Sequence, residues 1–306
     1  MEKKKSDDGG GGTHTIEYES LVATCHGRKS ILEPLGRGAY GEVCVSRRDT
    51  RLAVKFFKET WCWAYEVSML HYLHTRGASH LAPRVHGINP KATTISMRRM
   101  DGTLADVNFN DDPKKKLRVS VDIIRAVLTW LSLGVAHRDI KPQNILVTKE
   151  GDLAFCDWGM AVPLSRGGPI GKPGCRTRGN ATQTRMVTRW YRAPEILLDQ
   201  RNYDMERVDI WALGCILLEL WTCPNTKPLR ERPHANLLAG TSDLHQLLLI
   251  CEVLGEPDIE GLCSGDIAHE ELLRVMPRYY TPHHFARAKL NKLMGPQLEG
   301  LADWES

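Results

Sequence analysis

Two aspartates, a lysine and an asparagine stand close together near the middle of the chain. Asp139, Lys141 and Asn144 lie within the segment His137–Asn144, and Asp157 follows eighteen residues after Asp139. Carboxylate and carboxamide oxygens are the ligands that suit a hard cation such as Mg²⁺. The spacing therefore predicts a divalent-metal site in this part of the chain.

A lysine inside an apolar strand is a second chemical signal. Lys55 follows Ala53 and a valine and precedes two phenylalanines. A strand lysine is usually an exposed edge residue, but an ammonium group buried among apolar neighbours is costly unless it is paired. Glu66, on the next predicted helix, is the natural partner for Lys55.

Glycines recur at close spacing in Gly36–Val43, which reads Gly-Arg-Gly-Ala-Tyr-Gly-Glu-Val. Glycines let the backbone turn tightly and approach phosphate oxygens without a Cβ clash. A dinucleotide-binding fold has the same glycine spacing but places a helix after it. Here a strand follows, which disfavours a dinucleotide site and leaves either a phosphate-binding hairpin or a plain glycine-rich hairpin.

The elements around these residues change from strands to helices along the chain. Short apolar and β-branched runs predict strands at Ile31–Leu32, Glu42–Ser46, Arg51–Phe57, Arg84–His86 and Thr94–Met97. Apolar residues at helical spacing predict helices over Trp61–Leu73, Pro113–Leu133, 209–221 and 243–254. In Pro113–Leu133 these residues are Leu117, Val121, Ile124, Leu128 and Leu131. The lysine run 114–116 near the start of this helix is expected to form a solvated face.

Length and composition are those of a globular protein, with 306 residues, 42% hydrophobic and 25% charged. The net charge of +4 is too mild for a dedicated nucleic-acid binder. The chain has no apolar run long enough to span a bilayer and none typical of a signal peptide. Nine scattered cysteines without a CxxC pair argue against a disulfide framework or zinc site. We therefore expect a soluble intracellular protein, in the cytoplasm or nucleus, that binds neither nucleic acid nor membrane.

The three chemical signals, in this order, resemble those of the eukaryotic protein kinases. The resemblance covers about residues 29–260 and implies an α+β, bilobal fold with ATP in the cleft. A small β-rich N-lobe with one key helix would span about 29–100, and a larger α-helical C-lobe about 101–306. Residues 1–28, rich in lysine and glycine, are expected to form a flexible tail.

The resemblance assigns ATP binding to the glycine-rich segment and the strands after it. Lys55 matches the lysine that binds the α- and β-phosphates, and Glu66 matches its ion-pair partner. Met97 resembles the residue that gates the back pocket, and Arg98–Met100 resembles the hinge that bonds the adenine. The implied ATP-binding set is Leu35, Gly36, Arg37, Gly38, Ala39, Tyr40, Gly41, Glu42, Val43, Ala53, Lys55, Glu66, Met100 and Leu146.

The resemblance also assigns the catalytic and metal-binding residues. Asp139 matches the catalytic aspartate that accepts the proton of the substrate hydroxyl, and Lys141 matches the lysine that steadies the γ-phosphate. Asn144 and Asp157 match the two Mg²⁺ ligands. Asp209, at the start of the predicted apolar helix 209–221, is expected to cap that helix and to anchor the catalytic loop. Lys141 at this position, together with Thr188, is similar to the serine/threonine kinases rather than the tyrosine kinases.

Three further segments resemble the CMGC group, which contains the cyclin-dependent, MAP and glycogen-synthase kinases. They are Tyr65–Leu70, Val187–Glu195 and Asp243–Pro257. In that group Arg192 lies near the pocket that favours proline after the target residue. The resemblance therefore adds proline-directed specificity as a hypothesis.

Two departures from the family concern the ATP and metal sites. Trp158 replaces the usual phenylalanine after the metal-binding aspartate, and its N–H needs a partner when buried. We expect it to complete the hydrophobic stack with His137 and Leu70, to change how easily the segment flips, and to leave activity intact. The spacing of 11 residues from Lys55 to Glu66 is short. The loop before the helix must therefore be tight, which weakens a cyclin prediction.

Two more departures concern the activation segment and the end of the chain. Arg138 precedes the catalytic aspartate, where an arginine usually binds a phosphate on that segment. The family's phosphothreonine position is Gln183, flanked by Thr182 and Thr184. Either a neighbouring threonine is phosphorylated, or the kinase is free of that switch. Glu195 has no recognisable arginine motif to pair with, so we expect the large lobe to be trimmed at its end.

The leading hypothesis is an active serine/threonine protein kinase that transfers the γ-phosphate of ATP to protein substrates with Mg²⁺. The alternative is a pseudokinase-like scaffold or binding module. The complete set of catalytic residues argues against the scaffold, and only Trp158 and the short C-terminal part argue for it. A regulatory partner fits this hypothesis, but the sequence does not single out a cyclin.

Overall fold

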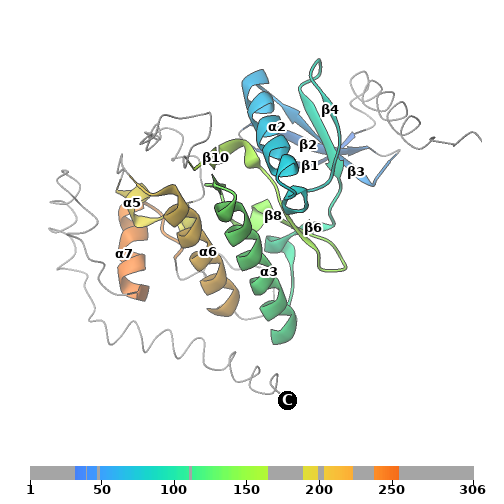
Figure 1. Ribbon diagram of the computed structural model, residues 1–306. Coiled ribbons are helices and arrows are strands. Elements are labelled where there is room, and N and C mark those ends of the chain that lie inside the picture. The colour runs from blue at the N-terminus through green and yellow to red at the C-terminus, as the bar shows by residue number, and fades with distance from the viewer. Residues whose placement is uncertain are drawn as a thin grey trace, which may run out of the picture. The chain divides into compact units, whose positions relative to one another are not determined.

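The computed structural model describes residues 32–38, 40–46, 49–109, 112–164, 189–198, 203–222 and 238–254. The chain divides into two compact units, Met1–Met100 and Asp101–Ser306 (Figure 1). The predicted flexible tail and the predicted trimmed end lie outside the described residues, as do Ala39, Thr182, Thr184 and Thr188.

The first unit is an antiparallel sheet with one long helix. The strands are β1 (Leu32–Arg37), β2 (Gly41–Ser46), β3 (Leu52–Phe57), β4 (Val85–Asn89) and β5 (Thr94–Arg98), in the order β1-β2-β3-β5-β4. The helix α2 (Thr60–Thr75) lies against the sheet (Figure 1). The five predicted strands and the predicted helix are therefore confirmed.

The core of the first unit forms between α2 and the middle strands. Its buried cluster is Ala53, Phe57, Cys62, Ile95 and Met97. Only two residues separate the end of β3 from the start of α2, so the predicted tight loop is confirmed. After α2 the backbone takes a positive φ of 72° at Gly77, a conformation that glycine adopts without steric cost and that commonly ends helices.

The glycine-rich segment forms the hairpin between β1 and β2. The first strand extends further than its two predicted residues and continues through Gly36 to Arg37, with a register shift between Pro34 and Gly36. The N–H of Gly38 donates to the carbonyl of Gly41 at 2.8 Å and closes the turn. A Cβ on Gly41 would overlap the carbonyl oxygen of Phe56 on β3, so only glycine fits there.

The second unit is mainly helical. Its helices are α3 (Pro113–Ser132), α5 (Pro194–Leu197), α6 (Met205–Thr222) and α7 (Asp243–Leu254). Its short strands form two small sheets. β6 (Gly102–Thr103), which precedes α3, joins β8 (Ile145–Val147) and β9 (Leu153–Phe155) in one sheet, and β7 (Val135–Ala136) pairs with β10 (Val162–Pro163). Single 3-10 turns occur at Ser79–Leu81, Leu104–Asp106, Pro142–Asn144, Trp158–Met160 and Arg189–Tyr191. The predicted α+β class, with a β-rich N-lobe and a helical C-lobe, is confirmed.

The helix α3 begins where the sequence predicts but buries a different face. Asp112 caps it, since its side chain accepts the N–H of Lys115 at 2.9 Å, and Pro113 occupies the first turn. The buried residues are Lys116, Val119, Ser120, Ile123, Val127 and Trp130. The apolar residues whose spacing predicts the helix are half-buried or exposed instead, and Leu128 is 53% exposed.

The buried face of α3 contains polar residues because α6 supplies partners for them. The indole N–H of Trp221 donates to Ser120 at 3.1 Å. The ammonium group of Lys116 lies 5.2 Å from the centroid of the Trp221 ring, and Lys116 is only 1% exposed. The expectation of a solvated lysine run is therefore wrong for Lys116.

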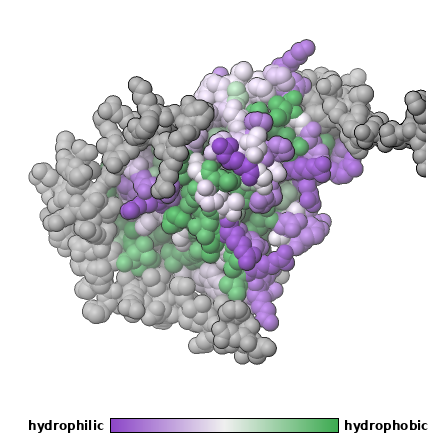
Figure 2. All heavy atoms as spheres, in the orientation of Figure 1, coloured by the Kyte–Doolittle hydropathy of each residue, from purple (hydrophilic) through white to green (hydrophobic). Residues whose placement is uncertain are grey.

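Helices α3 and α6 pack side by side in the second unit (Figure 1). Figure 2 shows hydrophobic side chains gathered over this region of the displayed face. Among the helices that the structure describes, none has both the length and the apolarity that a bilayer crossing requires.

Candidate active site

The predicted ion pair of the first unit is present. Nζ of Lys55 lies 2.6 Å from Oε2 of Glu66, which joins β3 to α2. Lys55 is 8% exposed and Glu66 is 3% exposed. A short contact between two buried charges offsets part of the cost of removing each from water. The pair therefore fixes the lysine within the apolar cluster that the sequence placed around it.

The other predicted ATP-binding residues divide between the two units. In the first unit Gly36, Arg37 and Gly38 are exposed in the hairpin, while Tyr40 and Val43 pack against the buried cluster. Leu35 is exposed, Gly41 and Ala53 are buried, and Glu42 bonds Arg37 at 3.3 Å. Met100 ends the first unit, and Leu146 lies on β8 of the second.

The predicted catalytic residues of the second unit lie in direct contact. Nζ of Lys141 donates to both carboxylate oxygens of Asp139, at 2.9 and 3.1 Å. Nδ2 of Asn144 donates to the same carboxylate at 2.9 Å and to the backbone carbonyl of Asp139 at 2.8 Å. Asp139 is 5% exposed, and burial is the main cause that raises the pKa of its carboxyl above the ordinary value. The structure thus presents one buried, oriented carboxylate.

His137 links this loop to the segment that carries Asp157, a predicted metal ligand. The backbone N–H of Asp139 donates to Nδ1 of His137 at 3.3 Å, so Nε2 carries the proton and donates to the Cys156 carbonyl at 3.1 Å. Burial lowers the pKa of His137 to about 4. The ring is therefore neutral, and its two hydrogen bonds join the backbone of Asp139 to that of Cys156.

The carboxylate of Asp209, on α6, anchors the predicted catalytic loop. It accepts the backbone N–H of His137 at 2.6 Å and that of Arg138 at 2.8 Å. Arg138 needs such support because its φ is +68°, a left-handed conformation that is unfavourable for a non-glycine residue. The anchoring role expected from the sequence is present. The capping role is wrong, since α6 begins four residues earlier, at Met205.

The two predicted metal ligands follow the catalytic loop. Because Nδ2 of Asn144 is engaged by Asp139, its Oδ1 is the atom left to face a ligand. Asp157 has a φ of +65°, and its charge acts on both His137 and Asp139. A carboxamide oxygen and a carboxylate are a donor set that fits a hard divalent cation.

Trp158 occupies the position after Asp157 and is 1% exposed. Its indole N–H donates to the Phe155 carbonyl at 2.8 Å, so the larger ring finds the partner that the sequence analysis requires. Its ring centroid lies 4.6 Å from that of His137, with the two rings tilted. The centroid lies 5.5 Å from that of Trp130, and these two rings meet edge to face. The predicted stack with His137 is present.

A network of charged residues surrounds the segment before α5. Nε of Arg189 lies 2.7 Å from Oδ1 of Asp243 on α7, and Nη1 of Arg192 lies 3.3 Å from the same oxygen. The hydroxyl of Tyr191 donates to Glu219 on α6 at 2.6 Å. This segment is therefore fixed to both α6 and α7.

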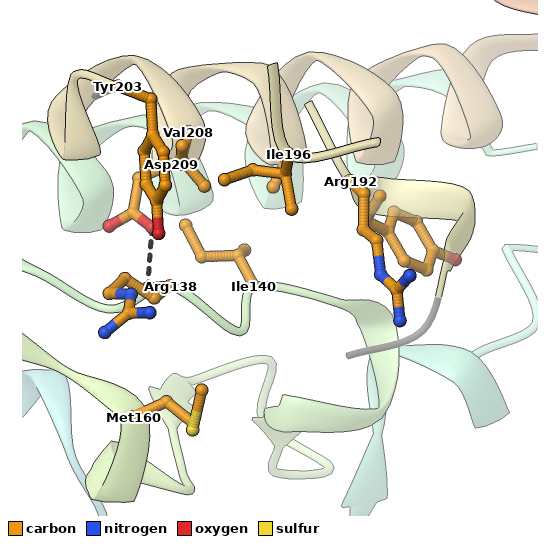
Figure 3. A pocket seen from close by; sticks show the side chains of 10 residues that line it. Arg138, Ile140, Met160, Arg192, Ile196, Tyr203, Val208 and Asp209 are labelled. Carbon is orange, nitrogen blue, oxygen red and sulfur yellow. Dashed lines mark hydrogen bonds between the residues drawn. The ribbon is translucent and has the colours of Figure 1, made fainter. Parts of the chain in front are cut away.

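Arg192 also lines a pocket between the catalytic loop and α6. Figure 3 shows Arg138 near one end, Arg192 near the other, and the side chains of Ile140, Ile196 and Val208 between them. Glu195, in the adjacent α5, makes no ion pair within the described part of the chain, and burial raises the pKa of its carboxyl.

Two contacts at this site were not foreseen from the sequence. Trp130 on α3 donates its indole N–H to Asp209 at 3.0 Å. Gln246 on α7 is fully buried, and its amide binds Gly240 N–H at 2.9 Å and the Trp190 carbonyl at 3.4 Å. The Trp130–Asp209 and Gln246–Trp190 bonds join residues far apart in the chain. The one sequence signal for these contacts is that Trp130 lies within the apolar pattern of a predicted helix.

Comparison with known proteins agrees with this geometry. The family model "Protein kinase domain" matches residues 30–262. Similar proteins include Mitogen-activated protein kinase p38b of Drosophila melanogaster, 31% identical over 81% of this chain and 67% of the relative. Mitogen-activated protein kinase 4 of Oryza sativa subsp. japonica is 33% identical over 82% of this chain and 66% of the relative. Mitogen-activated protein kinase HOG1 of Candida glabrata is 31% identical over 87% of this chain and 59% of the relative.

The chain belongs to the protein kinase family. Its similarity to these relatives places it among the serine/threonine kinases of the CMGC group, a family that uses ATP and a divalent metal to phosphorylate proteins. The chain spans about two thirds of the length of the curated relatives that it matches. Nothing in these findings favours the scaffold alternative.

Proposed function

We propose that this chain transfers the γ-phosphate of ATP to serine and threonine hydroxyls of protein substrates. The observation that carries the proposal is the buried carboxylate of Asp139, which is held by Lys141 and Asn144 on a loop anchored to Asp209. Phosphoryl transfer asks for positioning and charge stabilisation rather than covalent help from the protein. This arrangement supplies both.

Each residue has a distinct task in the proposed reaction. Asp139 orients the substrate hydroxyl and accepts its proton as the oxygen bonds to the γ-phosphorus, while the bond from the γ-phosphorus to the β,γ-bridging oxygen breaks and ADP leaves. Lys141, already bonded to Asp139, offsets the negative charge that the transferred phosphoryl group carries. Lys55, oriented by Glu66, binds the α- and β-phosphates. The glycines of the β1–β2 hairpin leave room for the backbone to approach the phosphates.

Magnesium is the metal we propose, with Asn144 and Asp157 as its protein ligands. Mg²⁺ prefers oxygen ligands and usually retains water and substrate phosphates in its shell, so two protein ligands suffice. When bound, it would neutralise phosphate charge. Asp157 has a left-handed backbone, and both of its chain neighbours contact the His137 ring, Cys156 through its carbonyl and Trp158 through its own ring.

We further propose that the substrates carry proline after the target residue. The support is the match of Val187–Glu195 to the CMGC pattern, and the position of Arg192, which is 7% exposed and paired with Asp243. Protein substrates and an upstream kinase are the partners this proposal implies. The threonines that such a kinase would modify, Thr182 and Thr184, lie outside the described residues.

Incubation with radiolabelled ATP, Mg²⁺ and paired peptide libraries tests the proposal. The libraries differ only in having proline or alanine after the serine or threonine. We expect label on serine and threonine, and at least several-fold more label with proline. Label no higher than in a chain-free blank would overturn kinase activity. Equal label in the two libraries would overturn only the proline preference.

The pH dependence of the reaction follows from Asp209 and Asp139. Burial raises the pKa of Asp209 to about 6, so below that pH its carboxyl becomes protonated and presents an O–H toward N–H donors. The catalytic loop then loses part of its anchor. Burial raises the pKa of Asp139 too, and its protonation would remove the base. We expect kcat to fall on the acid side with a midpoint near pH 6.

Stability should change much less over the same range, because the two shifts have opposite signs. Folded Asp209 binds a proton more readily than the unfolded chain, so it adds stability as the pH falls from about 6 to 4. Folded His137 binds one less readily, so it removes stability as the pH falls from 6.5 to about 4. Over its full pH range, each of the two pKa shifts changes the free energy of unfolding by about 3 kcal/mol. Urea unfolding and kcat, each measured at pH 7.5 and 5.5, check both predictions. A kcat that stays constant down to pH 5 contradicts the predicted acid limb.

A further inference from the structure

Trp130 is the residue of α3 that reaches the catalytic loop. Its side chain is fully buried, and its indole N–H donates to Oδ2 of Asp209 at 3.0 Å. The same oxygen accepts the N–H of His137 at 2.6 Å, while Oδ1 accepts that of Arg138 at 2.8 Å. The carboxylate therefore has three donors, two from the catalytic loop and one from α3.

The third donor fixes the direction in which the carboxylate points. The N–H groups of His137 and Arg138 alone would not fix the carboxylate, because the carboxylate and the loop could rotate together. The bond from Trp130 comes from a different element and removes this freedom. Its effect matters because Arg138, with its positive φ, must be held in an unfavourable conformation directly before Asp139.

The ring of Trp130 also supports the metal-binding segment. Its centroid lies 4.7 Å from that of Phe155 and 5.5 Å from that of Trp158, both edge to face. It lies 5.7 Å from the ring of His137. Trp130 thus contacts both His137, just before Asp139, and Trp158, just after Asp157.

We propose that Trp130 is a positioning residue for phosphoryl transfer, acting through Asp209 on the catalytic loop and through Trp158 on the metal-binding segment. It touches neither ATP nor substrate. The inference rests on the proposed kinase function, and the unusual Trp158 gives it a specific form. A tryptophan on α3 and a tryptophan after the metal-binding aspartate pack edge to face and make one aromatic support for both loops.

The chain offers a matched control for testing this role. Trp221 on α6 is also buried, and it also donates its indole N–H across the contact between α3 and α6, to Ser120 at 3.1 Å. The described contacts of Trp221 involve Ser120 and Lys116, not the catalytic loop. Trp130→Phe and Trp221→Phe remove the same atoms from the same pair of helices, so a purely structural role predicts equal effects.

The experiment compares both variants with the wild type in steady-state kinetics and thermal unfolding. We expect Trp130→Phe to lower kcat about tenfold with KM for ATP and peptide within twofold, because misplaced groups slow the chemical step. Trp221→Phe should keep kcat within twofold and lose a similar amount of thermal stability. Equal kcat in the two variants, whether both fall or neither does, overturns the proposal.

Amide hydrogen exchange provides a readout that does not depend on activity. The peptide containing His137 and Arg138 should exchange faster in Trp130→Phe than in the wild type, and at the wild-type rate in Trp221→Phe. Unchanged exchange in Trp130→Phe overturns the proposal even if the chain proves not to be a kinase. If Trp130→Phe fails to fold, Trp130→Met and Trp221→Met, which fill part of the same space without an N–H or O–H donor, carry the same comparison.

Discussion

Replacing Asp139 with asparagine is expected to lower kcat about a thousandfold while leaving KM for ATP within a few fold. The carboxamide has nearly the same shape but cannot accept the proton of the substrate hydroxyl. Its NH₂ group would also face the ammonium of Lys141, which now lies 2.9 Å from a carboxylate oxygen. The change should not reduce stability. Burial raises the pKa of this carboxyl, which means that the buried site disfavours the charged form.

The matched control for this substitution is Asp152→Asn. Asp152 lies in the same unit, in the turn between β8 and β9, and its carboxylate is exposed. The control should keep wild-type kcat, since it removes a charge far from the buried loop. Activity is measured with radiolabelled ATP, and stability by urea unfolding. If Asp139→Asn retains more than a tenth of wild-type kcat with an intact fold, Asp139 is not the base.

The sequence was sufficient to predict the group of polar residues around Asp139, because its members are close together in the chain. Asp139, Lys141 and Asn144 lie within six residues, so any compact turn brings them near one another, and the structure has them bonded. Lys55 and Glu66 were found for a different reason. An ammonium among apolar neighbours requires a buried anion, and the following helix offers a suitably placed one.

The contacts that the sequence did not predict join residues far apart in the chain. Trp130 binds Asp209 across 79 positions, and Trp221 binds Ser120 across 101. Hydrophobic periodicity cannot find them, because it ranks Lys116 and Ser120 as polar and Leu128 as core. The helix α6 reverses this ranking, since it provides an aromatic face for Lys116 and a donor for Ser120.

Asp209 illustrates a limit of reading helix boundaries. An aspartate before an apolar run is typical of a helix cap, and the pattern placed the start of the helix at this residue. The structure begins the helix at Met205, and Asp204 accepts the N–H groups of the first turn instead. Asp209 is thereby free to bind the catalytic loop. Of the two expected roles, cap and anchor, only the anchor is present.

Replacing Lys55 with methionine is the second substitution with a large expected effect. Its loss removes the proposed ligand of the α- and β-phosphates, and kcat should fall about a hundredfold. It also leaves Glu66, 3% exposed, without the ammonium that now lies 2.6 Å away. Breaking a buried pair from one side destabilises a protein by about 3 kcal/mol. Activity loss alone would therefore confuse a catalytic effect with a structural one.

The double variant Lys55→Met, Glu66→Gln separates the two effects. Removing both charges leaves no uncompensated ion, so the free energy of unfolding should return most of the way to the wild-type value. If Lys55 binds phosphate, kcat stays about a hundredfold low in the double variant despite the regained stability. If Lys55 serves only to neutralise Glu66, activity returns together with stability. Urea unfolding and kcat on the two variants and the wild type decide between these results, and recovery of both would remove Lys55 from the phosphate site.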